Sequence, residues 1–262
     1  MHTRVAILGF GSFGRFAAMH LAAHAEVRVH DVADRSAEVA ALNDELSTRG
    51  TAPIAWCSLA EACRAEVLVF AVPVQAMEGL LAQVSPLLRE RATPPLVLDV
   101  ASVKLKPLAL LKGALPPGTP IIGTHPCFGP QSAKHGLADQ PIALCNATAT
   151  AETYACVQQF LSQTLGLRVI ETTPDEHDRQ MAYVQGLTHL ITRAVGEMAL
   201  PETPLATAAY QRFVAMRDNL KFDSWDLFIT IARENPYAAA VRLAFQNKIE
   251  EIERRLAEDA SH

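Results

Sequence analysis

The first 170 or so residues alternate short apolar segments with longer segments whose apolar residues recur at helical spacing. Several of the apolar segments are rich in Val, Ile or Leu throughout, as expected of parallel strands that are buried on both faces. The predicted strands are RVAILGF, EVRVHDV, EVLVFAVP, PLVLDVA, PIIGTHP and PIALCNA, with LRVIETT after a helix near residues 152–164. Helix-like segments such as FGRFAAMHLAAH lie between them. This pattern predicts βαβ units in an α/β fold with a doubly wound, Rossmann-type sheet.

The pattern changes after Pro174. One long helix is predicted over DEHDRQMAYVQGLTHLITRAVGEMAL, and further helices over SWDLFITIAREN and PYAAAVRLAFQNKIEEIERRLAEDA. No strand-like alternation returns. The sequence therefore predicts an N-terminal Rossmann domain over residues 1–173 and an all-helical domain over residues 174–262.

Composition and charge narrow the class of protein. The chain has 262 residues, of which 50% are hydrophobic and 19% charged, with a formal net charge of -5. Lys and Arg are scattered, which argues against nucleic acid or a membrane surface as the main partner. No apolar run approaches the roughly 18 residues that span a bilayer, and the N-terminus lacks a signal-peptide cleavage site, so a cytoplasmic location is predicted. The cysteines form no CxxC pair, so neither a disulfide framework nor a metal site is predicted.

A glycine motif follows the first predicted strand and opens a helix. Gly9, Gly11 and Gly14 have G-x-G-x-x-G spacing, with Ser12 and Phe13 inside the motif. We expect Gly9 to make a tight turn, Gly11 to let a pyrophosphate approach the backbone, and Gly14 to let the helix pack on the strand. The N–H groups at the start of the helix then bind the anion. The motif predicts a dinucleotide-binding domain.

The end of the second predicted strand carries an acidic residue, Asp31. A carboxylate there accepts hydrogen bonds from the adenosine ribose hydroxyls and repels a 2′-phosphate, so NAD is the predicted cofactor. Arg35 keeps NADP as an alternative. A glycine turn in a fold that binds no nucleotide is a second alternative.

Candidate site residues follow three other predicted strands, and they are Val72, Pro73, Asp99, Ser102, Lys104 and His125. Ligands of open parallel sheets lie outside the carboxyl ends of the strands, so we expect Ser102 and His125 to lie near the nicotinamide. The alternatives are a helix N-cap for Ser102 and a structural buried histidine for His125. A Cys127–His125 nucleophile pair is a further alternative, although the flanking residues match no thiol-enzyme signature.

The motifs DVASVK and GTHPCFGP, with DEHDRQMAYVQGLTHLITRAVGEM and KFDSWDLFITIARENPYAAAVRLAF after them, resemble the prephenate/arogenate dehydrogenases of tyrosine biosynthesis. The resemblance covers nearly the whole chain and is greatest to the single-function arogenate dehydrogenases of plants. Cys127 stands where members usually have Met. The resemblance implies NAD(P)-dependent oxidation of a ring hydroxyl while the ring carboxylate leaves as carbon dioxide. It implies His125 as the catalytic base and Ser102 as a second partner of the hydroxyl.

Further site residues come from the long predicted helix, in which His177, Met181, Gln185, His189 and Arg193 recur every four residues and form one stripe. The resemblance implies that Gln185 and His189 contact the substrate. Arg193 is a further candidate, with a surface or ion-pair arginine as its alternative.

The choice of substrate depends on the side chain of the cyclohexadienyl acid. Arogenate carries an ammonium group where prephenate carries a keto group, and Asp223 matches the acidic residue that plant-type members associate with arogenate. The resemblance therefore implies arogenate, with prephenate or dual specificity as the alternative. Arg217 and Lys221 are candidates to hold substrate carboxylates, or else are solvated charges. The apolar segments of the helical domain favour a homodimer, so this domain is expected to serve substrate binding and dimerisation.

Two other classes of protein are alternatives. One is a second class of dehydrogenase with a cofactor domain followed by helices, and the other binds NAD without catalysing a reaction. A β-hydroxyacid or imine-reducing dehydrogenase would not need GTHPCFGP after DVASVK. A non-catalytic, NAD-sensing or partner-binding Rossmann protein gains nothing from a base beside the nicotinamide.

Overall fold

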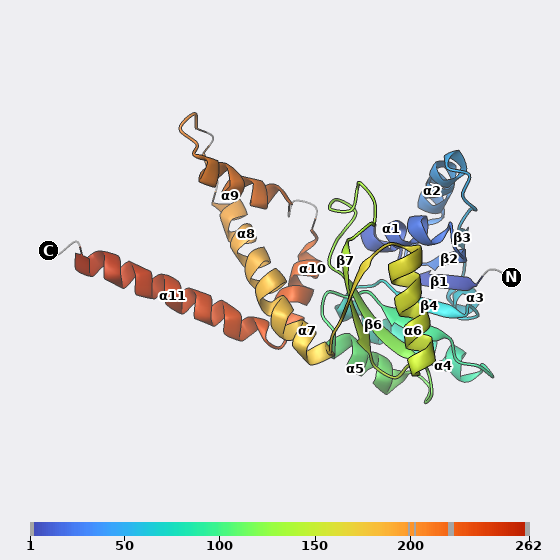
Figure 1. The fold of residues 1–262 in the computed structure, drawn as a ribbon. Coiled ribbons are helices and arrows are strands. Elements are labelled where there is room, and N and C mark those ends of the chain that lie inside the picture. Colours follow the sequence, from blue (N-terminus) through green and yellow to red (C-terminus); the bar gives the residue numbers. More distant parts are fainter. Residues whose placement is uncertain (1–2, 199, 202, 220–222, 260–262) are drawn as a thin grey trace. The chain divides into compact units, whose positions relative to one another are not determined.

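The computed structural model describes residues 3–198, 200–201, 203–219 and 223–259 (Figure 1). The chain forms two compact units, Met1–Pro174 (unit 1) and Asp175–His262 (unit 2). The boundary expected from the sequence, between residues 173 and 174, lies one residue before this division. No helix among the described residues has both the length and the apolar character needed to cross a membrane.

Unit 1 is built on an eight-stranded sheet in the order β3-β2-β1-β4-β5-β6-β7-β8. The strands are β1 (Arg4–Leu8), β2 (Glu26–His30), β3 (Ala55–Trp56), β4 (Val67–Phe70), β5 (Leu96–Asp99), β6 (Ile121–Pro126), β7 (Pro141–Asn146) and β8 (Arg168–Glu171). The doubly wound sheet predicted from the sequence is confirmed. The strand β3 was not predicted, because a strand of two residues is too short to show an apolar pattern.

Two strands, β7 and β8, depart from the parallel arrangement expected from the sequence and run antiparallel to the other six. β6 and β7 pair antiparallel, with His125 opposite Ala143, whereas the other neighbouring strands pair parallel. Parallel neighbours need a long crossover, usually a helix, to bring the chain back to the same end of the sheet. Residues 127–140 between β6 and β7 form turns without a helix. The chain therefore reverses direction at this point.

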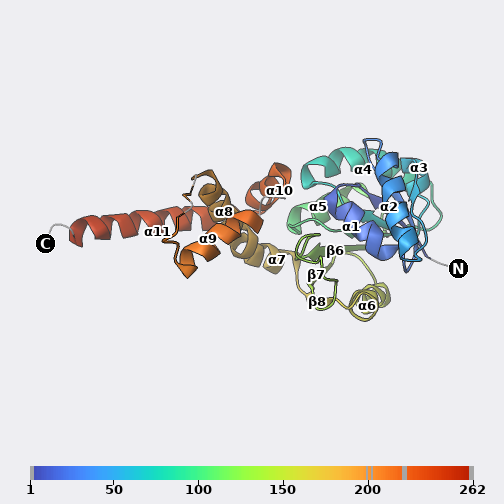
Figure 2. The same ribbon diagram turned by 90° about the horizontal axis from the view of Figure 1, so that it is seen from above.

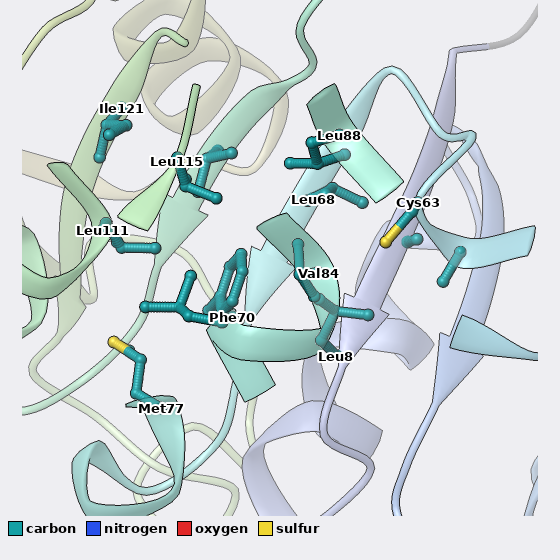
Figure 3. Packing of buried hydrophobic residues seen from close by; sticks show 14 of the residues in the cluster. Leu8, Cys63, Leu68, Phe70, Met77, Val84, Leu88, Leu111, Leu115 and Ile121 are labelled. Carbon is teal, nitrogen blue, oxygen red and sulfur yellow. The ribbon is translucent and has the colours of Figure 1, made fainter. Parts of the chain in front are cut away.

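Helices cover both faces of the sheet (Figures 1 and 2). They are α1 (Ser12–Leu21), α2 (Ser36–Thr48), α3 (Leu59–Ala62), α4 (Val74–Arg89), α5 (Leu105–Ala114) and α6 (Ala151–Gln159), the last continued by the π-helical turn η1 (Phe160–Thr164). Because successive strand residues point to opposite faces, Ala6 and Leu8 of β1 join the core under α3, α4 and α5. Val5 and Ile7 join the core under α1 and α2. Figure 3 shows the first of these cores.

These two cores determine where the strands end. Phe70 at the end of β4 and Leu8 at the end of β1 are both fully buried and lie opposite each other in the parallel register. Complete burial of each such side chain contributes about 1.5–3 kcal/mol, so a register shift would be costly. The loops that follow β1 and β4 are therefore held side by side.

The regular elements of unit 2 among its described residues are all helices. Its elements are α7 (Pro174–Met181), η2 (Ala182–Leu187), α8 (Thr188–Glu197), α9 (Ala208–Asn219), α10 (Trp225–Ile229), η3 (Thr230–Glu234) and α11 (Ala238–Asp259). The single long helix predicted after Pro174 is the continuous run of α7, η2 and α8, interrupted by the π-helical turn η2. The helix α9 was not predicted, because its apolar and charged residues do not separate onto two faces.

Candidate active site

The glycine loop joins β1 to α1 at the carboxyl edge of the sheet. Gly9 has a φ of +102°, and a Cβ atom there would lie 2.5 Å from the carbonyl oxygen of Ala71. A Cβ atom on Gly14 would lie 2.0 Å from the carbonyl oxygen of Gly9, so any larger residue would push α1 away from the loop. A Cβ atom on Gly11 would meet nothing within 4 Å, and no side chain caps α1. The start of α1, at Ser12, thus has the open space that an anionic group needs.

Asp31 follows β2 and holds the glycine loop from the other side. Its Oδ2 accepts a hydrogen bond of 2.7 Å from the N–H of Phe10, and its Oδ1 accepts one of 3.0 Å from the N–H of Ala33. Arg35 donates from Nη1 to Oε1 of Glu38 at 2.6 Å. The carboxylate of Asp31 therefore lies beside the glycine turn, and the guanidinium of Arg35 is paired with an acid of its own helix.

The ends of β4, β5 and β6 lie at the same edge of the sheet as the glycine loop, because these strands and β1 run parallel. Val72 contacts the glycine loop, since its Cγ1 would lie 2.8 Å from a Cβ atom on Gly9. Pro73 is the N-cap residue of α4. His125 is the next-to-last residue of β6 and its side chain is buried, and Ser102 is half-buried in the loop between β5 and α5. The residues predicted in unit 1 are thus gathered at one sheet edge.

Two alternatives from the sequence do not fit this edge. The N-cap residue of α5 is Lys104, so Ser102 does not cap the helix. The thiol of Cys127 lies 3.5 Å from the backbone carbonyl oxygen of His125, to which it donates. Burial raises the pKa of Cys127, which keeps the thiol protonated and makes it a poor nucleophile.

A buried ion pair that the sequence analysis did not predict joins the ends of β5 and β6. Lys104 Nζ lies 2.7 Å from both carboxylate oxygens of Asp99 and 2.7 Å from the carbonyl oxygen of Thr124. Both charged side chains are 0% exposed. The only sequence signal is the charged residue at each end of the segment DVASVK, and spacing alone did not show that the two side chains meet.

In unit 2, three of the predicted substrate residues, His189, Arg193 and Asp223, lie together. Gln185 is in η2, His189 and Arg193 are on α8, and Asp223 precedes α10. His189 Nδ1 lies 3.9 Å from Asp223 Oδ2, which is beyond hydrogen-bonding distance. Arg193 Nη2 donates to the backbone carbonyl oxygens of Asp223 and Ser224, each at 3.0 Å. α8 is thereby joined to the segment that carries Asp223.

The Arg193 guanidinium also packs on aromatic rings, 4.8 Å from the centre of Phe228 and 5.4 Å from that of Trp225. Within the described part of the chain, His189 Nδ1 and Arg193 Nε are buried without a hydrogen-bond partner. Buried polar atoms are nearly always hydrogen-bonded, so these two atoms have hydrogen-bonding capacity that the described residues do not use.

Burial shifts the pKa values of two residues in this cluster, His189 and Asp223. Burial lowers the pKa of His189, an effect that Arg193 reinforces and Asp223 opposes, so the imidazole is neutral at neutral pH. Burial raises the pKa of Asp223, and both His189 and Arg193 oppose this rise. A cation bound beside Asp223 would favour its ionised form.

Two predicted substrate residues are not placed. Lys221 lies outside the described residues, and so does the side chain of Arg217. Their assignment to substrate carboxylates stays a prediction.

Taken together, a tight glycine loop at the sheet edge, an acid at the end of the second strand and a buried histidine at a nearby strand end are features of a dinucleotide-binding dehydrogenase domain. Residues 21–171 match the family model described as prephenate dehydrogenase, nucleotide-binding domain. This match covers more than half of the chain, and the chain belongs to the prephenate dehydrogenase family. The resemblance inferred from the motifs is confirmed. Residues 194–262 match a second model, described as TYRAAT1-like, C-terminal domain.

Individual relatives and structures agree with this family. Arogenate dehydrogenase 2, chloroplastic, of Arabidopsis thaliana is 27% identical over 263 residues, which cover 97% of this chain and 71% of the relative. Arogenate dehydrogenase 1, chloroplastic, of the same plant is 26% identical over 99% of this chain but only 40% of the relative's length. The crystal structure of prephenate dehydrogenase from A. aeolicus, in complex with hydroxyphenyl propionate and NAD+, has a TM-score of 0.72 at 18% identity. The match covers 100% of this chain and 93% of the chain in that crystal structure, which shows that the two proteins share a fold.

Membership of this family makes the chain an oxidoreductase. It disfavours the imine-reducing or β-hydroxyacid dehydrogenases and the non-catalytic NAD sensor that the sequence left as alternatives.

Proposed function

We propose that this protein oxidises arogenate with NAD and releases tyrosine and carbon dioxide. The family supports a cyclohexadienyl acid as substrate. The observation that carries the choice of arogenate is the position of Asp223, a half-buried carboxylate in one cluster with His189 and Arg193. Prephenate dehydrogenase activity, or activity with both acids, is the alternative.

NAD, when bound, supplies the acceptor for the hydride. The open side of Gly11 and the uncapped start of α1 fit its pyrophosphate. The carboxylate of Asp31, fixed by two backbone N–H groups, favours the ribose hydroxyls of NAD and repels the 2′-phosphate of NADP. Arg35 is already paired with Glu38 through Nη1, which offsets part of the charge that would attract such a phosphate. These contacts support NAD over NADP.

His125 is proposed to take the proton of the ring hydroxyl, and Ser102 to hydrogen-bond the same hydroxyl. The carbon that carries the hydroxyl gives up a hydride, the bond between the ring and its carboxylate breaks, and carbon dioxide leaves. The electron pair of that bond makes the ring aromatic, and the oxygen takes up a proton to become the phenol of tyrosine. A positioned general base contributes about 10²–10⁴ in rate. The burial of His125 excludes water from the proton that it accepts.

Asp223 is proposed to bind the ammonium group of arogenate. The carboxylate is half-buried, so a keto group beside it would leave its charge poorly compensated, whereas an ammonium group would pair with it. The guanidinium of Arg193 lies in the same cluster and is proposed to bind a substrate carboxylate. The cluster therefore offers Asp223 for the ammonium group of arogenate and Arg193 for a carboxylate of the same substrate.

The test is to assay the purified protein with arogenate and with prephenate, each with NAD and with NADP. The highest kcat/KM is expected for arogenate with NAD. Asp223→Asn should shift the ratio of kcat/KM values toward prephenate by about tenfold, which corresponds to about 1.4 kcal/mol. The control is Asp226→Asn, at an exposed position of α10, which should leave the ratio unchanged. An unchanged ratio in Asp223→Asn would remove the assignment of Asp223, and a wild-type preference for prephenate would favour the alternative function.

We also propose that unit 2 forms a homodimer through α11. Ile249, Ile252 and Leu256 recur at helical spacing on this helix and are 44%, 50% and 59% exposed. A stripe of this kind is typical of a surface that a second copy covers. Light scattering should give twice the monomer mass, and Ile252→Glu should reduce it; a wild-type monomer would contradict the proposal. The cytoplasmic location stays a prediction, since both Arabidopsis relatives are chloroplastic.

A further inference from the structure

We propose that the buried ion pair of Asp99 and Lys104 positions both reacting side chains, Ser102 and His125. We further propose that Gly123 is glycine because the lysine side chain must pass over it. The inference rests on the roles given above to Ser102 and His125, and it makes Asp99, Lys104 and Gly123 positioning residues of the reaction.

The ion pair first closes the loop that carries Ser102. Asp99 is the last residue of β5, and Lys104 is the N-cap residue of α5. Their side chains meet with Nζ 2.7 Å from each carboxylate oxygen, so the loop between them is tied at both ends. The N–H of Ala101 donates to Asp99 Oδ1 at 2.9 Å, which fixes the loop from inside as well. Ser102 lies between these fixed points.

The same lysine holds the strand that carries His125. Its Nζ donates to the carbonyl oxygen of Thr124 at 2.7 Å, and the Thr124 hydroxyl donates to the carbonyl oxygen of Asp99 at 2.7 Å. These bonds extend the pairing of β5 with β6 beyond the register position where Asp99 lies opposite Gly123. Thr124 immediately precedes His125, so the backbone that carries the imidazole is fixed by a charged group.

Gly123 provides the space for this arrangement. A Cβ atom at this position would lie 3.0 Å from Lys104 Cδ, 3.0 Å from Leu108 Cδ1 and 3.2 Å from Asp99 Oδ2. Glycine within a strand weakens the strand and often marks a close approach of another group. Here the close approach is made by the buried lysine side chain.

Stability alone does not account for the pair. Both side chains are fully buried, and burying two charges carries a desolvation cost that the attraction between them often fails to exceed. An apolar pair of similar volume is frequently as stable. Accurate placement of reacting groups is a different requirement, because a misplacement of about 1 Å can lower a rate about 100-fold. The arrangement is therefore explained by the accuracy it gives to Ser102 and His125.

The test uses the double variant Asp99→Leu/Lys104→Met, because either single change would leave a buried charge without its partner and could prevent folding. The double variant should fold and bind NADH as the wild type does, since the glycine loop is unchanged. Its kcat should fall by about 10–100-fold, while KM for the cyclohexadienyl acid changes by less than about threefold. Gly123→Ala, which crowds the pair but keeps both charges, should give a smaller loss of kcat.

The control is Leu88→Ala, a buried position near the end of α4, which should lower the melting temperature and leave kcat unchanged. The proposal is overturned if the folded double variant keeps kcat within about twofold of the wild type, or if Leu88→Ala loses as much kcat as the double variant.

A second readout does not depend on turnover. The ring signals of His125, assigned in the NMR spectrum by their loss in His125→Gln, should shift in the double variant and stay in place in Leu88→Ala. Unchanged ring signals in the double variant would overturn the inference. A wild-type protein that oxidises neither acid would instead contradict the proposed function, and the NMR comparison would still decide whether the ion pair positions the imidazole.

Discussion

The sheet edge of unit 1 and the polar cluster of unit 2 are built in opposite ways. At the sheet edge, the charged groups are bound to backbone atoms and to each other: Asp31 accepts from two N–H groups, and Lys104 donates to Asp99 and to a carbonyl oxygen. In the cluster, His189 Nδ1 and Arg193 Nε are buried without partners among the described residues. The first site is preorganised before any ligand arrives, and the second keeps hydrogen-bonding capacity that a ligand can use.

This difference matches the work proposed for each site. Proton and hydride transfer require atoms at fixed positions, which strands and a buried ion pair provide. Recognition of a charged side chain requires groups that are left without partners until the substrate binds. Changes at the sheet edge should therefore alter kcat or cofactor binding, and changes in the cluster should alter the response to substrate and pH.

The largest effect is expected from His125→Gln. The amide keeps a polar group at the end of β6 but cannot act as a base, so kcat should fall by about 10²–10⁴. NADH affinity, measured by fluorescence titration, should not change. A variant that retains more than about a tenth of the wild-type kcat would show that His125 is not the base, and would weaken the contrast between the two sites.

The glycine loop offers a matched pair of substitutions. Gly14→Ala places a Cβ atom 2.0 Å from the Gly9 carbonyl oxygen, so the free energy of unfolding in urea should fall by about 3 kcal/mol. Gly11→Ala meets no atom within 4 Å and should leave unfolding nearly unchanged. It should nevertheless weaken NADH binding by about tenfold, because the methyl group takes the space of the pyrophosphate. Equal loss of stability in both variants would contradict this division of roles.

The smallest effect is a pH dependence in unit 2. The pKa of His189 is lowered in the folded protein, so below about pH 6.5 the unfolded chain binds a proton that the folded chain does not. The stability of the wild type should therefore fall as pH decreases from 6.5 toward the lowered pKa. The raised pKa of Asp223 acts in the opposite sense, above about 3.8, and opposes part of this loss. Melting temperatures between pH 5 and 7 should depend less on pH in His189→Gln, and parallel profiles would argue against the burial of a neutral imidazole.

Much of the fold could be predicted from the sequence, because apolar periodicity is local. The βαβ pattern, the glycine loop and the change to helices after Pro174 each follow from residues close together in the chain. The strand β3 and the helix α9 were missed for the same reason, since one is too short and the other lacks a clear apolar face.

The candidate site could be predicted only as a set of residues. The predicted residues of unit 1 do lie at one edge of the sheet, and His189, Arg193 and Asp223 do lie together. The contacts of Arg193 were not predictable, because its carbonyl partners are 30 and 31 residues away and depend on how α10 packs against α8.

The sequence by itself determined the order of strands and helices, the glycine spacing and the family, all of which depend on which residues stand near one another along the chain. Only the tertiary structure decided that β7 and β8 run antiparallel to the other strands, that Lys104 turns back to Asp99, and that Gly123 is open to receive the lysine. These features depend on strand register and on close packing between segments that are distant in the chain. Neither strand register nor packing between distant segments produces a periodic pattern of residues in the sequence.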